Sequence, residues 1–346
     1  MDNSPDARGS NNQPQPQIIQ VQTSNNRLPA WMLGSVTLGF LLPMCSCFVL
    51  GFGFLFALTL GGGSGAAPEV AIGDTVGVVR VEGIIYAQDG TQYTAGAGSG
   101  IVIDQLKRAN ADPNVKAVVL RIDSPGGSVV GSAQIYEQIL KMEKPVVVSM
   151  AATAASSNYY ISAPADYIFA RPNTFTGSIG VIVSVPNAEE LFEELGVENR
   201  TITSAENKEF GSLFTELTPE QVEILQVIVD ETFQEFVQIV ADGRGLSIED
   251  VIDLADGRIY TGRQALALGL VDELGNLDDA IAEAAARGGI SGEPNILEYR
   301  NQPTFADFLG GVSLRLNQSE AALLQDSLDE ITTPRLEFRY VGPGTD

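Results

Sequence analysis

A short apolar run, a pair of glycines and the start of a helical stretch follow one another in AVVLRIDSPGGSVV, residues 117–130. Ala117–Ile122 is a short, largely apolar run, as is typical of a strand buried on both faces of a parallel sheet. Gly126 and Gly127 allow a sharp turn and leave backbone N–H groups free. A helical pattern then runs over Val129–Met142. This order predicts a strand–turn–helix unit of an α/β fold.

Similar units extend outward from this one in both directions. Strands are predicted at Val76–Val81, Pro145–Met150 and Val181–Val185, and a further helix near Gly100–Arg108. Alternation of strands and helices favours parallel strands joined by right-handed crossovers. The expected domain is therefore a parallel sheet with a helical cover.

Helix starts are marked clearly in the second half of the chain. Thr218 and Gln221 form a capping box with proline at the first helical position, which predicts a long amphipathic helix to about Val240. Ser247 and Thr261 predict the starts of two more helices. From about Ser291 the pattern weakens. Residues 319–331 could form a short helix, and residues 336–341 a strand or a loose tail.

An uncharged apolar stretch precedes the folded region, from about Trp31 to Leu60. It is long enough to cross a bilayer, which takes about 20 residues. About thirty mostly polar residues come before it, which favours a retained anchor over a cleaved signal peptide. Arg27 precedes the span and the next basic residue is Arg80, so the N-terminus is predicted to be cytoplasmic and the folded domain extracytoplasmic.

These observations divide the chain into five parts. They are a disordered cytoplasmic tail at 1–29, a single transmembrane helix at 30–60, a linker at 61–75, a folded domain at 76–290 and a C-terminal tail at 291–346. Localisation in the cell membrane follows from the anchor.

Composition excludes several functions. The formal net charge is −24, so no basic patch is available to bind nucleic acid. The two cysteines, Cys45 and Cys47, lie within the apolar stretch and have no metal-ligand spacing. No metal or cofactor is predicted, and no phosphate-binding G-x-x-x-x-G-K-[ST] loop is present.

The chain contains no histidine, which limits its possible chemistry. A Ser-His-Asp triad and a histidine-ligated zinc are impossible. A nucleophilic serine would need a carboxylate or a neutral lysine as its base. Of the five lysines, only Lys208 follows the serine-rich segment Met150–Tyr160.

Three segments carry candidate chemistry, and each has a plain structural alternative. The DSPGGS segment at 123–128 could supply an oxyanion hole or form an ordinary turn. Met150–Tyr160 could hold a nucleophile, or be a small-residue helix packed on the sheet. Ser204–Phe210 could supply the base, or be a solvated loop.

Together the three segments resemble the bacterial and archaeal signal peptide peptidases of the serine–lysine type, relatives of the Clp protease and crotonase superfamily. The resemblance runs from about Val76 to Ala285. It includes TGSIGV at 176–181 and DGRIYTGRQALALGLVDELG at 256–275. It implies a Clp protease/crotonase-like fold, so that 76–290 is a peptidase domain.

The resemblance also implies roles for individual residues. Ser156 matches the nucleophile, Lys208 the general base and Ser178 the serine that orients the lysine. The N–H of Gly126 or Gly127, with that of Ser157, would bind the oxyanion. A lysine accepts a proton only when neutral, and burial favours that form, so neighbouring Glu206 and Glu209 are expected to point away.

Two departures from the family pattern occur beside the nucleophile. Ser157 and Asn158 stand where the family usually has two glycines, so Ser157 is a rival nucleophile and the added bulk could narrow the site. Ala205 replaces another usual glycine.

In this family the serine and the lysine come from neighbouring subunits, which implies a ring-like homo-oligomer. The leading hypothesis is a membrane-anchored serine endopeptidase that cleaves signal-peptide remnants or other apolar extended peptides through an acyl-enzyme. The alternatives are a catalytically silent membrane scaffold of the same fold and a crotonase-like acyl-CoA enzyme.

Overall fold

A computed structural model of the chain describes residue 71 and residues 73–87, 96–299 and 335–340. The predicted tail at 1–29, the predicted transmembrane span at 30–60, most of the linker and the possible helix at 319–331 lie outside these residues. Within the described ranges, no helix is both long and apolar enough to cross a membrane.

Eight strands form the central sheet, in the order β10-β8-β6-β4-β1-β12, with β7 beside β6 and β11 beside β7. Their bounds are β1 (Thr75–Glu82), β4 (Val115–Ser124), β6 (Val146–Ala155), β7 (Tyr167–Ala170), β8 (Phe175–Gly177), β10 (Ile259–Thr261), β11 (Glu273–Leu274) and β12 (Asn295–Tyr299). All of these pairings are parallel except that of β10 with β8. The predicted parallel sheet is therefore confirmed.

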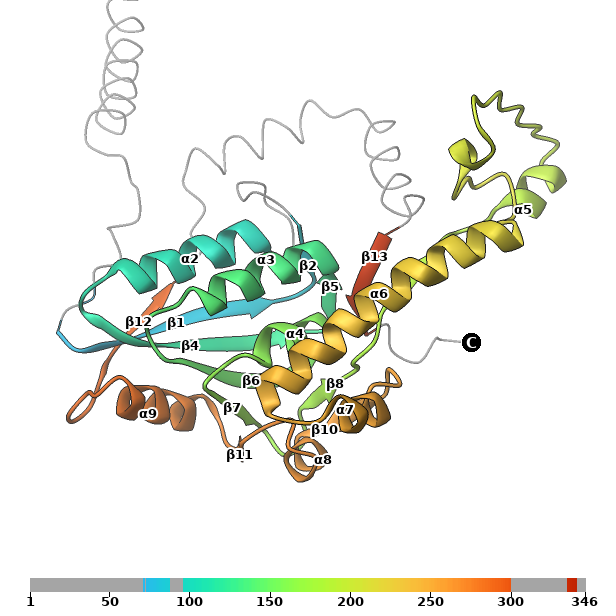
Figure 1. The fold of residues 1–346 in the computed structure, drawn as a ribbon. Coiled ribbons are helices and arrows are strands. Elements are labelled where there is room, and N and C mark those ends of the chain that lie inside the picture. Colours follow the sequence, from blue (N-terminus) through green and yellow to red (C-terminus); the bar gives the residue numbers. More distant parts are fainter. Residues whose placement is uncertain (1–70, 72, 88–95, 300–334, 341–346) are drawn as a thin grey trace, which may run out of the picture. The chain divides into compact units, whose positions relative to one another are not determined.

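Helices cover both faces of the central sheet (Figure 1). The helices of the described residues are α2 (Ser99–Ala111), α3 (Val129–Leu140), α4 (Ser157–Ser162), α5 (Glu189–Glu194), the 3-10 helix η1 (Glu206–Glu209), α6 (Pro219–Arg244), α7 (Ile248–Leu254), α8 (Gly262–Ala267) and α9 (Leu277–Arg287). Of these, α5 projects away from the sheet (Figure 1). Val79 and Val81 of β1 belong to the core on the α2 and α3 side. Val76 and Val78 alternate with them and pack in the α9 core.

The capped helices begin where the sequence predicted. Thr218 and Gln221 form the expected capping box, and α6 extends to Arg244. Ser247 and Thr261 each accept a hydrogen bond from the backbone three residues ahead, at the starts of α7 and α8. These caps depend on contacts within four residues, which is why they could be predicted locally.

The segment after Met150 is not the small-residue helix that was considered as an alternative. β6 continues in extended form to Ala155, because Thr153, Ala154 and Ala155 pair in parallel with β8. Ala154 and Ala155 are fully buried there. Small side chains thus serve close strand packing in this segment, and the helix α4 begins only after Ser156.

A second, smaller sheet lies at the carboxyl end of β4 and β6. Its order is β3 (Ala97–Gly98), β2 (Ile85–Tyr86), β5 (Gly126–Ser128), β13 (Arg335–Arg339) and β9 (Ile182–Ser184). The strand expected at Val181–Val185 therefore exists as β9, but it pairs antiparallel with β13 rather than joining the parallel sheet.

Candidate active site

Ser156 occupies a strained turn between β6 and α4. Its backbone has φ 58° and ψ −118°, a region that residues other than glycine seldom adopt. The Ser156 N–H donates to the Gly177 carbonyl at 2.7 Å, and its own carbonyl accepts from the Tyr159 and Tyr160 N–H groups. These bonds hold the turn, and Ser156 is 1% exposed.

Ser178 lies at the end of the adjacent strand. β6 and β8 run parallel with Ala155 opposite Gly177, so the two serines are the next residues along neighbouring strands. Ser178 also has a positive φ, 49°, and its N–H donates to the Arg258 carbonyl at 2.9 Å. Throughout the part of the chain that the structure describes, Ser156 and Ser178 are the two residues other than glycine with positive φ. Backbone strain of this kind concentrates at functional sites.

The DSPGG turn, residues 123–127, lies beside the helix that follows Ser156. Gly126 and Gly127 have φ of 117° and 155°. A Cβ on Gly126 would lie 2.2 Å from the Phe338 carbonyl oxygen, and one on Gly127 would lie 2.2 Å from that of Ile85. The Gly126 N–H donates to Ser124 Oγ at 3.3 Å, and Gly127 lies opposite Phe338 in the ladder between β5 and β13.

Asn158 is a structural brace that the sequence did not indicate. Its side chain is fully buried, and its Nδ2 donates to Ser124 Oγ at 2.6 Å and to the Ser124 carbonyl at 3.1 Å. Asn158 therefore joins the helix after Ser156 to the DSPGG turn. In the sequence, the only sign was that Asn158 stands where the family it resembles usually has a glycine.

Replacing Asn158 with alanine should lower the free energy of unfolding by about 1–3 kcal/mol, because both buried Ser124 oxygens lose the hydrogen bond from the Asn158 amide and Ser124 Oγ keeps only the 3.3 Å bond from the Gly126 N–H. Turnover of peptide should fall as well, since the turn and the serine lose their link. Urea unfolding and peptide hydrolysis test both effects. Asn173→Ala is the control, because Asn173 is exposed and its side chain accepts a hydrogen bond from Arg263 at the surface. Equal stability of the two variants would contradict the role of Asn158.

Ser157 and Lys208 differ sharply in their surroundings. Ser157 is fully buried, and among the described residues its Oγ has no hydrogen-bond partner. Lys208 is exposed in η1, and its side chain forms no hydrogen bond or ion pair with any residue in the described ranges. In the described part of the chain, neither Glu206 nor Glu209 forms an ion pair with Lys208. Among the described residues of one subunit, no hydrogen bond joins Lys208 to Ser156 or Ser178, so the structure brings together the two serines and the glycine turn but not the lysine.

Four aromatic rings pack together behind the serine. Tyr160 lies 5.4 Å from Tyr136, 5.3 Å from Phe236 and 5.1 Å from Phe338, measured between ring centroids. Burial, together with a 2.7 Å hydrogen bond from the hydroxyl to Glu235, raises the pKa of Tyr160 well above its usual range. Tyr160 therefore remains an uncharged donor at all ordinary pH values.

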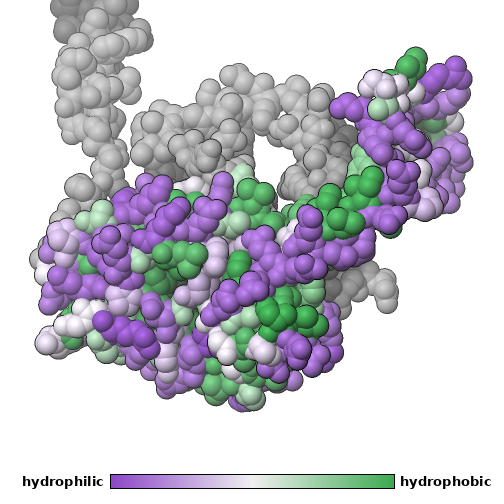
Figure 2. Space-filling view, viewed as in Figure 1, coloured by the Kyte–Doolittle hydropathy of each residue, from purple (hydrophilic) through white to green (hydrophobic). Residues whose placement is uncertain are grey.

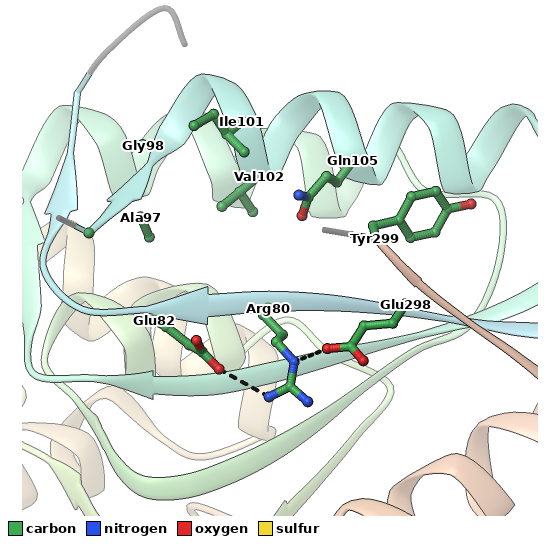
Figure 3. A pocket seen from close by; sticks show the side chains of 10 residues that line it. Arg80, Glu82, Ala97, Gly98, Ile101, Val102, Gln105, Glu298 and Tyr299 are labelled. Carbon is green, nitrogen blue, oxygen red and sulfur yellow. Dashed lines mark hydrogen bonds and ion pairs between the residues drawn. The ribbon is translucent and has the colours of Figure 1, made fainter. Parts of the chain in front are cut away.

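A pocket of about 450 Å³ lies elsewhere, at the β12 edge of the central sheet. Figure 3 shows Arg80 within it, paired with Glu82 and Glu298, while Ile101 and Gln105 project from α2. None of the predicted site residues lines this pocket. In the described ranges, no cluster of acidic side chains or cysteines is arranged to hold a metal ion.

Comparison with known proteins agrees with this geometry. Residues 138–291 match the model of peptidase family S49, and residues 76–176 match that of Clp protease. The chain is 35% identical to Protease 4 of Salmonella typhi, over 73% of this chain but 41% of that protein. It is 43% identical to a putative protease of Synechocystis sp., covering 54% of this chain and 68% of the relative.

A putative signal peptide peptidase SppA of Enterococcus faecium is 40% identical, over 58% of this chain and 59% of that protein. The chain spans less than half the length of the Salmonella protein, because the match covers 41% of it. The matched regions contain both strained serines, the glycine turn and the α4 helix that follows Ser156. On this evidence, the chain belongs to peptidase family S49.

Proposed function

We propose that this chain is a membrane-anchored serine endopeptidase that cleaves extended apolar peptides, such as cleaved signal peptides, with a Ser156–Lys208 dyad. The observation that carries the proposal is the pairing of strained Ser156 with strained Ser178 at adjacent strand ends. The names of the relatives, Protease 4 and signal peptide peptidase, support this class of activity and substrate.

The proposed chemistry gives each group one role. Ser156 Oγ attacks the peptide carbonyl carbon while neutral Lys208 takes the hydroxyl proton. The N–H groups of Gly127 and Ser157 stabilise the oxyanion. Lys208 returns the proton to the leaving amine, and water then hydrolyses the acyl-enzyme with the lysine again acting as the base. Ser178 orients the lysine.

In this proposal, assembly brings the lysine of one subunit to the serine of its neighbour. Lys208 is exposed on the arm formed by α5, η1 and the first half of α6 (Figure 1). Figure 2 shows apolar side chains along this projecting part of α6. The large exposed ones are Val222, Ile224, Val227 and Ile228. Such a patch is typical of a protein interface, so a ring-like homo-oligomer in which Lys208 reaches a neighbour's Ser156 fits both observations.

Membrane attachment is proposed from the apolar stretch at 30–60, with the N-terminus in the cytoplasm and the peptidase domain outside. The charge difference between Arg27 and the uncharged far end of the span supports this orientation. A protease added to spheroplasts should therefore cut the linker at 61–75 and spare the tail at 1–29. Cleavage of the tail with a protected linker would reverse the topology.

A fluorophosphonate probe separates the peptidase hypothesis from its two alternatives, because it reacts with an activated serine. Peptide mapping should find the label on Ser156. An assembled, folded chain that is never labelled would instead favour the silent scaffold. The crotonase-like acyl-CoA enzyme also predicts no label, since that chemistry needs no nucleophilic serine.

A further inference from the structure

The turn that precedes β10 holds the backbone of Ser178 on both sides. The Ser178 N–H donates to the Arg258 carbonyl at 2.9 Å, and the Gly257 N–H donates to the Ile179 carbonyl at 3.1 Å. These two bonds extend the antiparallel pairing of β10 with β8 past the end of β8 (Figure 1). The backbone before and after the Ser178 side chain is therefore tied to residues 257–258.

Packing of β10 against β8 supports the same conformation. A Cβ on Gly177 would lie 2.5 Å from Tyr260 Cδ2, so the ring of Tyr260 lies close against the Gly177 backbone. The Tyr260 hydroxyl donates to the Leu254 carbonyl at 2.9 Å, which fixes the ring. Ser178 needs this support, because its φ of 49° lies in a region that is unfavourable for residues with a side chain.

Asp256 closes the turn that makes these contacts. Its Oδ1 accepts a hydrogen bond from the Arg258 backbone N–H at 3.1 Å. An aspartate that accepts from the backbone two residues ahead forms an Asx turn, which fixes a tight bend. Gly257, in the middle of the bend, has a φ of 83°, which glycine adopts without strain. The Asp256 carboxylate thus sets the position of the two backbone groups that hold Ser178 and Ile179.

The same carboxylate pairs with the Arg258 side chain. Arg258 Nε donates to both oxygens of Asp256 at 2.7 Å, and Arg258 Nη2 pairs with Oδ2. The side chains of Asp256 and Arg258 are 44% and 63% exposed, so this ion pair adds little to global stability. Hydrogen bonds from Arg258 hold the pKa of Asp256 below its usual range. The carboxylate therefore stays ionised wherever a lysine base would be neutral.

We propose that Asp256 is a positioning residue for catalysis, which acts through the turn at 256–258 to hold strained Ser178 in the conformation that orients Lys208. Without the carboxylate the turn would loosen, and Ser178 would relax toward an ordinary φ and carry its hydroxyl away. The inference rests on the proposed function for the role of Ser178. It deepens that proposal by assigning the alignment of the lysine in part to an exposed carboxylate outside the dyad.

Peptide hydrolysis by full-length chains tests this role. Asp256→Ala should lower kcat by about tenfold and leave KM within about twofold, because an interaction that serves only the reacting groups changes kcat. Asp256→Asn should keep most of kcat, since asparagine also accepts in an Asx turn. Asp253→Ala is the matched control and should keep the kcat of the parent. Asp253 is exposed in α7, and its side chain forms no hydrogen bond or ion pair within the described ranges.

A double mutant shows whether Asp256 acts through Ser178. In a chain that already carries Ser178→Ala, adding Asp256→Ala should lower kcat by less than about twofold, because the effects of residues that act as a unit are not additive. A loss of the same size with and without Ser178 would overturn the inference. So would a loss confined to KM, or an Asp256→Ala chain with the kcat of its parent.

Amide hydrogen exchange at Ser178 distinguishes failure of this inference from failure of the proposed function. Opening of the turn frees the Ser178 N–H, so its exchange should be about tenfold faster in Asp256→Ala than in Asp253→Ala. Thermal unfolding verifies that every variant is folded. Faster exchange in chains that never hydrolyse peptide would keep the hold on Ser178 and refute the peptidase. Unchanged exchange in an active enzyme would keep the peptidase and refute the role of Asp256.

Discussion

Replacing Ser156 with alanine should abolish peptide hydrolysis, with a loss of at least about 10⁴-fold, and leave the fold intact. Loss of a serine nucleophile has effects of this size in other hydrolases. Alanine retains the Cβ and removes only the attacking oxygen, so the turn held by the Gly177 carbonyl should persist. Peptide turnover and fluorophosphonate labelling measure the loss, and thermal unfolding verifies the fold.

Two companion variants sharpen the assignment. Ser157→Ala should keep most activity, because the Ser157 hydroxyl is buried without a hydrogen-bond partner among the described residues. Ser156→Gly should be inactive but more stable by about 1 kcal/mol or more, because glycine adopts the φ of 58° without strain. If Ser156→Ala keeps its activity and Ser157→Ala loses it, the nucleophile is Ser157.

Replacing Lys208 with alanine should reduce turnover by about 10²- to 10⁴-fold, the usual contribution of a general base. Lys208→Arg should not rescue the activity, because arginine stays protonated and cannot accept the serine proton. Ser178→Ala should have a smaller effect, since Ser178 orients the base. Rates for the three variants on one peptide provide the comparison, and near-normal turnover by Lys208→Arg would rule out the general-base mechanism.

Mixing the inactive Ser156→Ala and Lys208→Ala chains tests whether the dyad is shared between subunits. Some interfaces in a mixed ring would regain both groups, so partial activity should return. Light scattering and tagged subunits must establish that mixed oligomers form. Verified mixing without recovery would place the serine and the lysine in the same subunit.

Much of the fold could be predicted from the sequence because the relevant interactions are local. Continuous apolar runs predicted β1, β4 and the first part of β6, since each strand is buried in the sheet. Thr218 and Gln221 predicted the start of α6, because a capping box joins residues three apart. The resemblance to the serine–lysine signal peptide peptidases implied Ser156, Ser178 and Lys208 as candidates, and the absence of histidine had already pointed to a lysine or a carboxylate as the base.

Tertiary structure alone determined how these segments meet. Pairing of β6 with β8 extended β6 to Ala155 and brought Ser156 beside Ser178, which no local pattern indicated. The Asn158 side chain, expected only to add bulk beside the nucleophile, is buried and donates a hydrogen bond to Ser124. Phe338, more than two hundred residues further along the chain, pairs with Gly127 in the smaller sheet. Such contacts depend on the packing of the whole domain, because a strand can satisfy its backbone hydrogen bonds at any free strand edge. Capping and periodicity, in contrast, act within a few residues and can be recognised in the sequence itself.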